Sequence, residues 1–166
     1  SEYNWEPIGT AEEPFTGSID GNGYVLKNLK IRAHTDVGKG DEITNQAFIG
    51  VASGAHIKNL GIVDASISYY LKGIISKHNF CNVSGFVGEG KNSTVIEKCR
   101  FTGTITGKST SNTYIRASAF GCHNGTTIKN CYVNANISGT ADYLNTMVAG
   151  IAAWNENTTI ENCYVA

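Results

Sequence analysis

Five cysteines are the residues of this sequence with the most obvious chemical potential. Three of them, Cys99, Cys131 and Cys163, recur in one repeated unit, and each follows an isoleucine by three residues. No two cysteines form a C-x-x-C pair and no histidine accompanies the repeated three, so the spacing argues against a zinc site. Disulfides between in-register neighbours on parallel strands are geometrically awkward. The pattern therefore predicts small buried apolar side chains rather than a metal or redox centre.

Histidines and carboxylates form no recognisable constellation either. Four histidines occupy different positions within the repeats and share no ligand spacing: His34, His56, His78 and His123. A polysaccharide lyase or hydrolase needs carboxylates gathered on one face beside a base, whereas Asp20 and Asp64 fall on different predicted strands. The acidic stretch Ser18–Val25 has a single aspartate, which favours a turn over a calcium loop. We predict no catalytic residue, no metal site and no cofactor.

The chain is organised by the repeated unit that contains these cysteines. Its copies are Leu26–Ile31, Ile57–Ile62, Ile96–Phe101, Ile128–Val133 and Ile160–Val165. An apolar-Gly element and a polar turn precede the later copies, and helical periodicity is absent. Three short strands per repeat of about 32 residues predict an all-β parallel β-helix, expected to be right-handed, of about five coils. The expected single domain covers residues 1–166, with an N-terminal cap at 1–17 and repeats at approximately 18–46, 47–83, 84–116, 117–147 and 148–166.

Parity along the repeat predicts a bend just before each cysteine. Ile96 and Cys99 lie three residues apart, so both can face inward only if the chain turns at positions 97 and 98. The other copies have asparagine at the second of these positions, and asparagine tolerates left-handed backbone. The expected core ladder is Leu29, Leu60, Cys99, Cys131 and Cys163. The expected outward column is Lys27, Lys58, Glu97, Lys129 and Glu161, and the alternating charges of its last four members favour a role in register.

Composition limits the partners of the chain. Its 166 residues include 13 Lys or Arg and 14 Asp or Glu, which give a formal net charge of -1. This balance lacks the basic excess of nucleic-acid-binding proteins, and no apolar run approaches the roughly 18 residues of a membrane span. We predict neither nucleic-acid binding nor membrane insertion. Because the sequence lacks an initial methionine and stops in mid-repeat, we expect a fragment of a longer protein or end-to-end self-association.

Segments of variable length separate the repeats at residues 32–46, 69–83, 108–116 and 140–147. Each follows the same predicted strand, so we expect loops along one edge of the β-helix, where binding surfaces of repeat proteins usually develop. Aromatic rings there suit sugar rings or a protein partner. The alternative is that these rings fold back over their own loops. The candidate ligand-binding residues are Tyr69, Tyr70, His78, Tyr114, Arg116 and Tyr143.

The repeats resemble a known family. Gly85-Phe86-Val87-Gly88, a polar turn and the Ile-x-Asn-Cys unit are similar to the GLUG-type repeat of bacterial surface and secreted proteins, and the opening around Trp5–Gly9 is similar to the segment that precedes such repeats in gut bacteria. The resemblance implies a non-catalytic, extracellular adhesin or ligand-binding module whose partner is a host glycan or a surface protein. A structural spacer within a larger surface protein is the alternative, and a polysaccharide-active enzyme is a further one.

Overall fold

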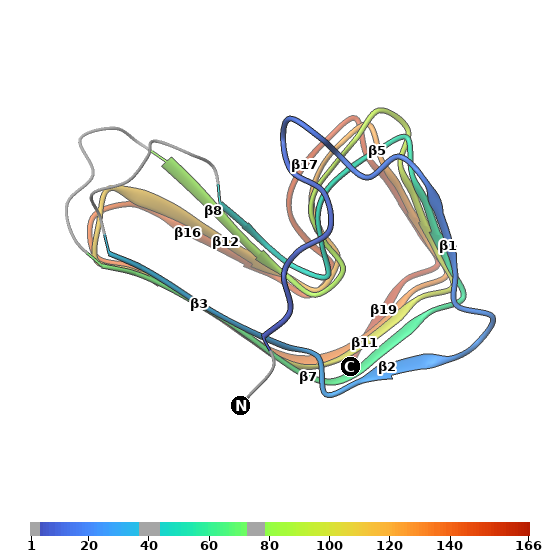
Figure 1. The fold of residues 1–166 in the computed structure, drawn as a ribbon, viewed down its shortest axis with the longest axis horizontal. Coiled ribbons are helices and arrows are strands. Elements are labelled where there is room, and N and C mark those ends of the chain that lie inside the picture. The colour runs from blue at the N-terminus through green and yellow to red at the C-terminus, as the bar shows by residue number, and fades with distance from the viewer. Residues whose placement is uncertain (1–3, 37–43, 73–78) are drawn as a thin grey trace.

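The computed structural model describes residues 4–36, 44–72 and 79–166. These residues contain strands and no helix, so they include no helix long and apolar enough to cross a membrane. The strands stack in parallel as a β-solenoid of about four turns (Figure 1). The predicted parallel β-helix is therefore confirmed, although the number of turns is about four rather than five.

Four parallel sheets run along the solenoid, and each turn crosses them in the same order. The anchor sheet comprises β1 (Ser18–Asp20), β6 (His56–Lys58), β10 (Val95–Glu97), β14 (Thr127–Lys129) and β18 (Thr159–Glu161). The long sheet comprises β2 (Val25–Lys27), β3 (Lys30–Asp36), β7 (Gly61–Lys72), β11 (Arg100–Ser109), β15 (Tyr132–Ala141) and β19 (Tyr164–Val165). The return sheet comprises β4 (Thr44–Gln46), β8 (Asn79–Ser84), β12 (Thr113–Ser118) and β16 (Thr146–Ala149). The glycine sheet comprises β5 (Ile49–Ser53), β9 (Val87–Lys91), β13 (Gly121–Asn124) and β17 (Ala152–Glu156).

The return sheet corrects the prediction of three strands per coil. Much of the sequence expected to form variable loops is strand, because β8 and β12 alternate inward and outward residues as a half-buried strand does. Cys81 and Val83 are buried, whereas Phe80 and Tyr114 are only partly covered. In cross-section the solenoid has two lobes (Figure 1). The return sheet and the C-terminal ends of the long strands form a narrow lobe. The anchor sheet, the glycine sheet and the N-terminal ends of the long strands form a wide lobe.

The predicted bend is confirmed by the backbone. Asn59, Asn130 and Asn162 have φ values of 53°, 56° and 50°, and Lys98 adopts the same conformation with φ 51°. These residues lie between the anchor strands and the long strands. The amide of Asn59 donates to Asp20 Oδ1 rather than to another asparagine, so the column shares a backbone conformation and not a side-chain ladder.

The first coil departs from the predicted register. Ser18–Asp20, not the Leu26–Ile31 copy, pairs with His56–Lys58, and Leu26 and Ile31 pair with Ile62 and Ile67. The cause is the Gly21-Asn22 turn, which takes the bend position of this coil with Asn22 at φ 49°. Lys27 is therefore not part of the charged column, and Asp20 is. The column becomes Asp20, Lys58, Glu97, Lys129 and Glu161, which alternates in charge throughout.

Ion pairs form along this column. Lys58 Nζ lies 3.4 Å from Asp20 Oδ2, and Lys129 Nζ lies 3.0 Å from Glu97 Oε2. His56 Nε2 lies 3.0 Å from the other oxygen of Glu97. Hydrogen bonding to Lys129, and to a lesser extent to His56, lowers the pKa of Glu97, and the Asn59 amide lowers that of Asp20.

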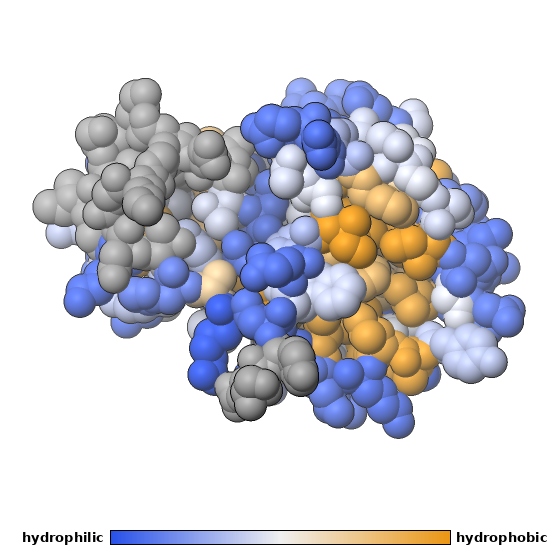
Figure 2. Space-filling model, viewed as in Figure 1, coloured by the Kyte–Doolittle hydropathy of each residue, from blue (hydrophilic) through white to orange (hydrophobic). Residues whose placement is uncertain are grey.

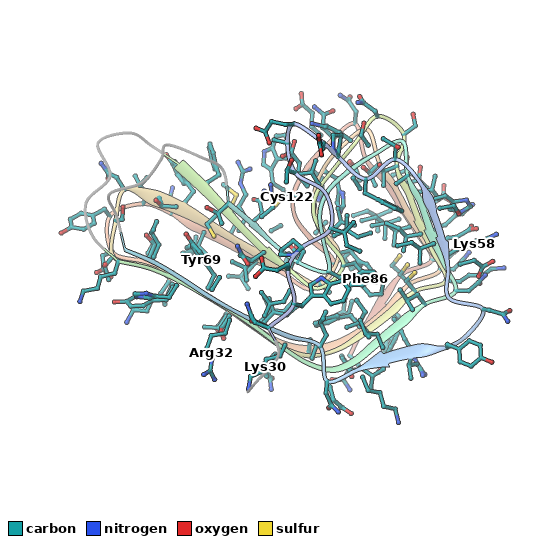
Figure 3. All side chains as sticks on the ribbon, viewed as in Figure 1. Lys30, Arg32, Lys58, Tyr69, Phe86 and Cys122 are labelled. Atoms are coloured by element: carbon teal, nitrogen blue, oxygen red, sulfur yellow. The ribbon has the colours of Figure 1, made fainter. Side chains whose placement is uncertain are left out.

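The core confirms that the repeated cysteines face inward. Cys99 and Cys131 are buried and Cys163 is partly buried, and all are free thiols. Each sulfur lies near the carbonyl oxygen two residues earlier, at 3.2 to 3.3 Å. The adjacent Cys99 thiol and burial raise the pKa of Cys131, so this thiol stays protonated. Phe86 and Phe120 are fully buried and stack with ring centroids 5.0 Å apart, and Phe86 lies within the wide lobe (Figure 3).

The N-terminal segment lies against the first coil. Trp5 stacks on Phe48 at 5.2 Å and its indole N–H donates to the Phe48 carbonyl at 2.9 Å. Phe15 forms a parallel bridge with Ala52. Apolar surface nevertheless remains visible on this end of the wide lobe (Figure 2).

Candidate functional site

The structure separates the residues that the sequence grouped as a binding edge. Tyr69 is 2% exposed and points into the narrow lobe (Figure 3), whereas Tyr70 faces the opposite side of the long sheet. Tyr114 and Arg116 lie on the return sheet, and Tyr143, 69% exposed, lies in the turn after β15. His78 lies outside the described residues. Tyr69 was a candidate ligand-binding residue, but its side chain is buried because β7 continues its alternation through Leu71.

Arg116 and Tyr114 belong to an aromatic cluster between the return and glycine sheets. The Arg116 guanidinium lies 3.9 Å from the centroid of Phe80 and 5.0 Å from that of Trp154, and Phe80 stacks on Tyr114 at 5.0 Å. Burial lowers the pKa of Arg116 and raises that of the nearby Cys122 to about 12. The guanidinium is thus used to join two sheets through cation–π contacts, which leaves it poorly placed to hold a ligand.

Tyr70 lies in an open pocket on the outer face of the long sheet. The pocket has a volume of about 350 Å³ and is lined by Arg32, Ala33, His34, Ser68, Tyr69, Tyr70, Thr106 and Lys108. The His34 and Tyr70 rings are 5.2 Å apart, and Lys108 Nζ lies 5.5 Å from the Tyr70 centroid. We call this hollow the Tyr70 pocket.

Strand register explains how these side chains meet. Tyr70 pairs with His34 of β3 on one side and with Lys108 of β11 on the other. Two residues earlier, Ser68 pairs with Arg32 and Thr106 in the same way. Because alternate residues of a strand share a face, both rows point outward, and Arg32 extends away from the sheet in Figure 3. The sequence could have indicated Arg32, His34 and Lys108, because each occupies an outward-facing position in the alternating pattern of its strand, as Tyr70 does in β7.

The chemistry of the pocket is that of recognition. The tyrosine ring and the aliphatic stems of Arg32 and Lys108 offer apolar walls, while hydroxyl, imidazole and cationic groups offer hydrogen bonds. Within residues 4–36, 44–72 and 79–166, no group of three or more His, Cys, Asp or Glu could hold a metal ion. Comparison with protein-family models, curated proteins and solved structures found no match to this chain.

Proposed function

We propose that this chain is a non-catalytic, extracellular ligand-binding module of a bacterial surface protein, adhesin-like in type, and that the Tyr70 pocket binds a sugar of a glycan. The observation that carries the proposal is the placement of an aromatic ring between a cation and an imidazole in an open pocket of about 350 Å³. Sugar rings have apolar faces that pack on aromatic rings and hydroxyls that need hydrogen-bond partners.

The fold supports this proposal by holding the pocket on rigid strands. Three neighbouring strands, β3, β7 and β11, each contribute residues at matched positions, so the pocket is preorganised and its binding costs little ordering entropy. We also infer that the solenoid winds to the right. A further inference is that residues 4–17 serve as its N-terminal cap, since Trp5 and Phe15 contact core residues of the first coil.

Tyr70→Ala tests the proposal, with Tyr24→Ala as its matched control. Tyr24 is 74% exposed and lies outside the pocket. On a glycan and surface-protein array, we expect Tyr70→Ala to weaken binding on the order of two- to ten-fold, which corresponds to the loss of one aromatic contact. Tyr24→Ala should bind as the wild type does, and both variants should keep their melting temperatures within a few degrees.

Three outcomes would contradict the proposal. Equal binding by the wild type and Tyr70→Ala would show that the Tyr70 pocket is not the binding site. A blank array for the wild type would favour the structural spacer. New chain ends or unsaturated products in a polysaccharide panel would show that the module is an enzyme.

A further inference from the structure

A second hollow lies outside the bend between the anchor and long sheets. Its volume is about 580 Å³, and it spans four coils. The lining residues are Asn22, Gly23, Asn59, Leu60, Gly61, Lys98, Cys99, Arg100, Asn130 and Tyr132. We call it the bend groove. Its lining contains two cations and no carboxylate, although the chain as a whole carries slightly more acids than bases.

Lys98 holds a backbone position that its neighbours fill with asparagine. Its φ of 51° lies in the left-handed region, which asparagine adopts readily because its short polar side chain forms local hydrogen bonds. Lysine has no such compensation. A residue kept in a disfavoured conformation points to a use for its side chain, and here that side chain contributes an ammonium group to the groove.

Arg100 lies beside Lys98 on the same side of the chain. The two residues lie on either side of the inward-facing Cys99 in sequence, and both are exposed. In the adjacent coil the position of Arg100 is taken by Gly61, and a Cβ atom there would lie 2.9 Å from Arg100 Nε. The missing side chain gives the guanidinium room to lie across the groove.

Tyr132 continues the row on the next coil. It pairs in register with Arg100 and stacks on Tyr164, with ring centroids 5.7 Å apart. Asn130 occupies the bend of the same coil. Lys98 and Arg100 therefore lie side by side on one coil. Asn130 and Tyr132 lie on the next coil, one strand spacing of ~4.8 Å further along the axis.

Two acids of the charged column are engaged with other side chains. Asp20 pairs with Lys58, and Glu97 pairs with Lys129 and His56, on the anchor sheet. Within the described part of the chain, no ion pair joins Lys98 or Arg100 to a carboxylate. The two cations thus remain available for an anionic ligand.

We propose that the bend groove binds the carboxylate or sulfate groups of an acidic polysaccharide that lies along the solenoid axis. Lys98 and Arg100 contact the anionic group, Arg100 in the bidentate manner suited to carboxylate and sulfate, and Tyr132 supports a neighbouring sugar ring. The proposal extends the glycan-binding function and names its ligand class, but it uses a surface separate from the Tyr70 pocket.

The test is a titration of the full chain with two labelled hexasaccharides, hexagalacturonate and neutral cellohexaose, followed by fluorescence anisotropy. The variants are Lys98→Asn, which restores the residue of the other coils, and Arg100→Gln. Lys91→Gln, on β9 of the glycine sheet, is the matched control for lost charge. We expect each groove variant to bind hexagalacturonate on the order of ten-fold more weakly, and the control to match the wild type. Lys98→Asn should melt at the wild-type temperature or higher.

Unchanged hexagalacturonate binding by both groove variants would overturn the inference. So would equal wild-type affinity for the neutral and acidic hexamers, or preference for a single-stranded DNA of the same charge that also depends on Lys98. The result is independent of the Tyr70 pocket: if Tyr70→Ala leaves glycan binding unchanged while Lys98→Asn weakens it, the proposed pocket fails and the bend groove stands.

Discussion

His123 is a buried histidine whose ionisation should make the protein sensitive to mild acid. It is 0% exposed, its Nε2 bonds to the Phe120 carbonyl at 3.1 Å, and its Nδ1 has no hydrogen-bond partner among the described residues. Burial lowers the pKa of His123 to about 4, against about 6.5 when unfolded. Between these values the unfolded chain binds a proton that the native chain does not, so stability falls as the pH drops from about 6.5 towards 4.

We expect the free energy of unfolding to fall by about 2 kcal/mol between pH 7 and pH 5, and by about 3 kcal/mol in total by pH 4. Urea unfolding followed by fluorescence at pH 7, 6 and 5 measures the effect, and His123→Gln should remove it. The lowered pKa values of Glu97 and Asp20 act in the same direction at more acidic pH, and so the comparison ends at pH 5. A wild-type urea midpoint that stays constant from pH 7 to pH 5 would contradict this account.

Single residues differ in how well the sequence predicted them. The asparagines of the bend were predictable, because a three-residue spacing between two inward side chains allows few backbone solutions. Tyr69 was not, because adjacent tyrosines at 69 and 70 resemble a loop until the alternation of β7 is known to continue beyond them. The Tyr70 pocket escaped prediction for the same reason, since its partners His34 and Lys108 come from other coils.

At the scale of the element, one extra residue sets the register of the long sheet. Phe101 pairs with Ile62 but Gly103 pairs with Ala65, so β7 carries a bulge at Asp64, which has φ 56° and whose N–H donates to Thr102 Oγ1 at 3.0 Å. Gly103 lies opposite the bulge with φ 141°, and a Cβ atom there would lie 2.2 Å from the Ala65 carbonyl oxygen. Only glycine fits this close approach.

Gly103→Ala should therefore destabilise the fold by about 2 kcal/mol, since it adds both a backbone clash and strain at positive φ. Chemical denaturation measures the loss. Thr104→Ala on the same strand is exposed and should stay within about 0.5 kcal/mol of the wild type. Equal stability of the two variants would mean that the bulge tolerates a side chain at this position.

The return sheet and the first coil show where element prediction reached its limit. Buried and partly exposed residues alternate along the first part of the strand Thr113–Ser118, as a sequence pattern would predict. The segments around this strand vary in length between coils, however, and this variation hides the repeat. In the first coil, Leu26–Ile31 imitates the anchor unit while Ser18–Asp20 takes its place. Local similarity could not distinguish the two, because the choice depends on which segment pairs with β6.

At the scale of the whole molecule, the core reaches solvent at both ends of the solenoid. Ile128 and Val133 are 0% and 1% exposed in an inner coil, whereas Ile160 and Val165, their partners in the last coil, are 42% and 47% exposed. At the other end, apolar surface remains on the wide lobe beside the N-terminal segment (Figure 2). Exposed parallel edges with apolar side chains favour pairing with another chain.

We therefore expect this chain to self-associate end to end as its concentration rises, by burying the last coil. Ile160→Lys should shift it towards monomer, because association would then bury an unpaired charge. Thr159→Lys is the matched control, since Thr159 precedes Ile160 on β18 and alternation turns it to the opposite face. Size-exclusion chromatography with light scattering over a range of concentrations measures both. A wild type that stays monomeric throughout would show that the exposed edge is tolerated, and equal association of the two variants would place the contact elsewhere than the last coil.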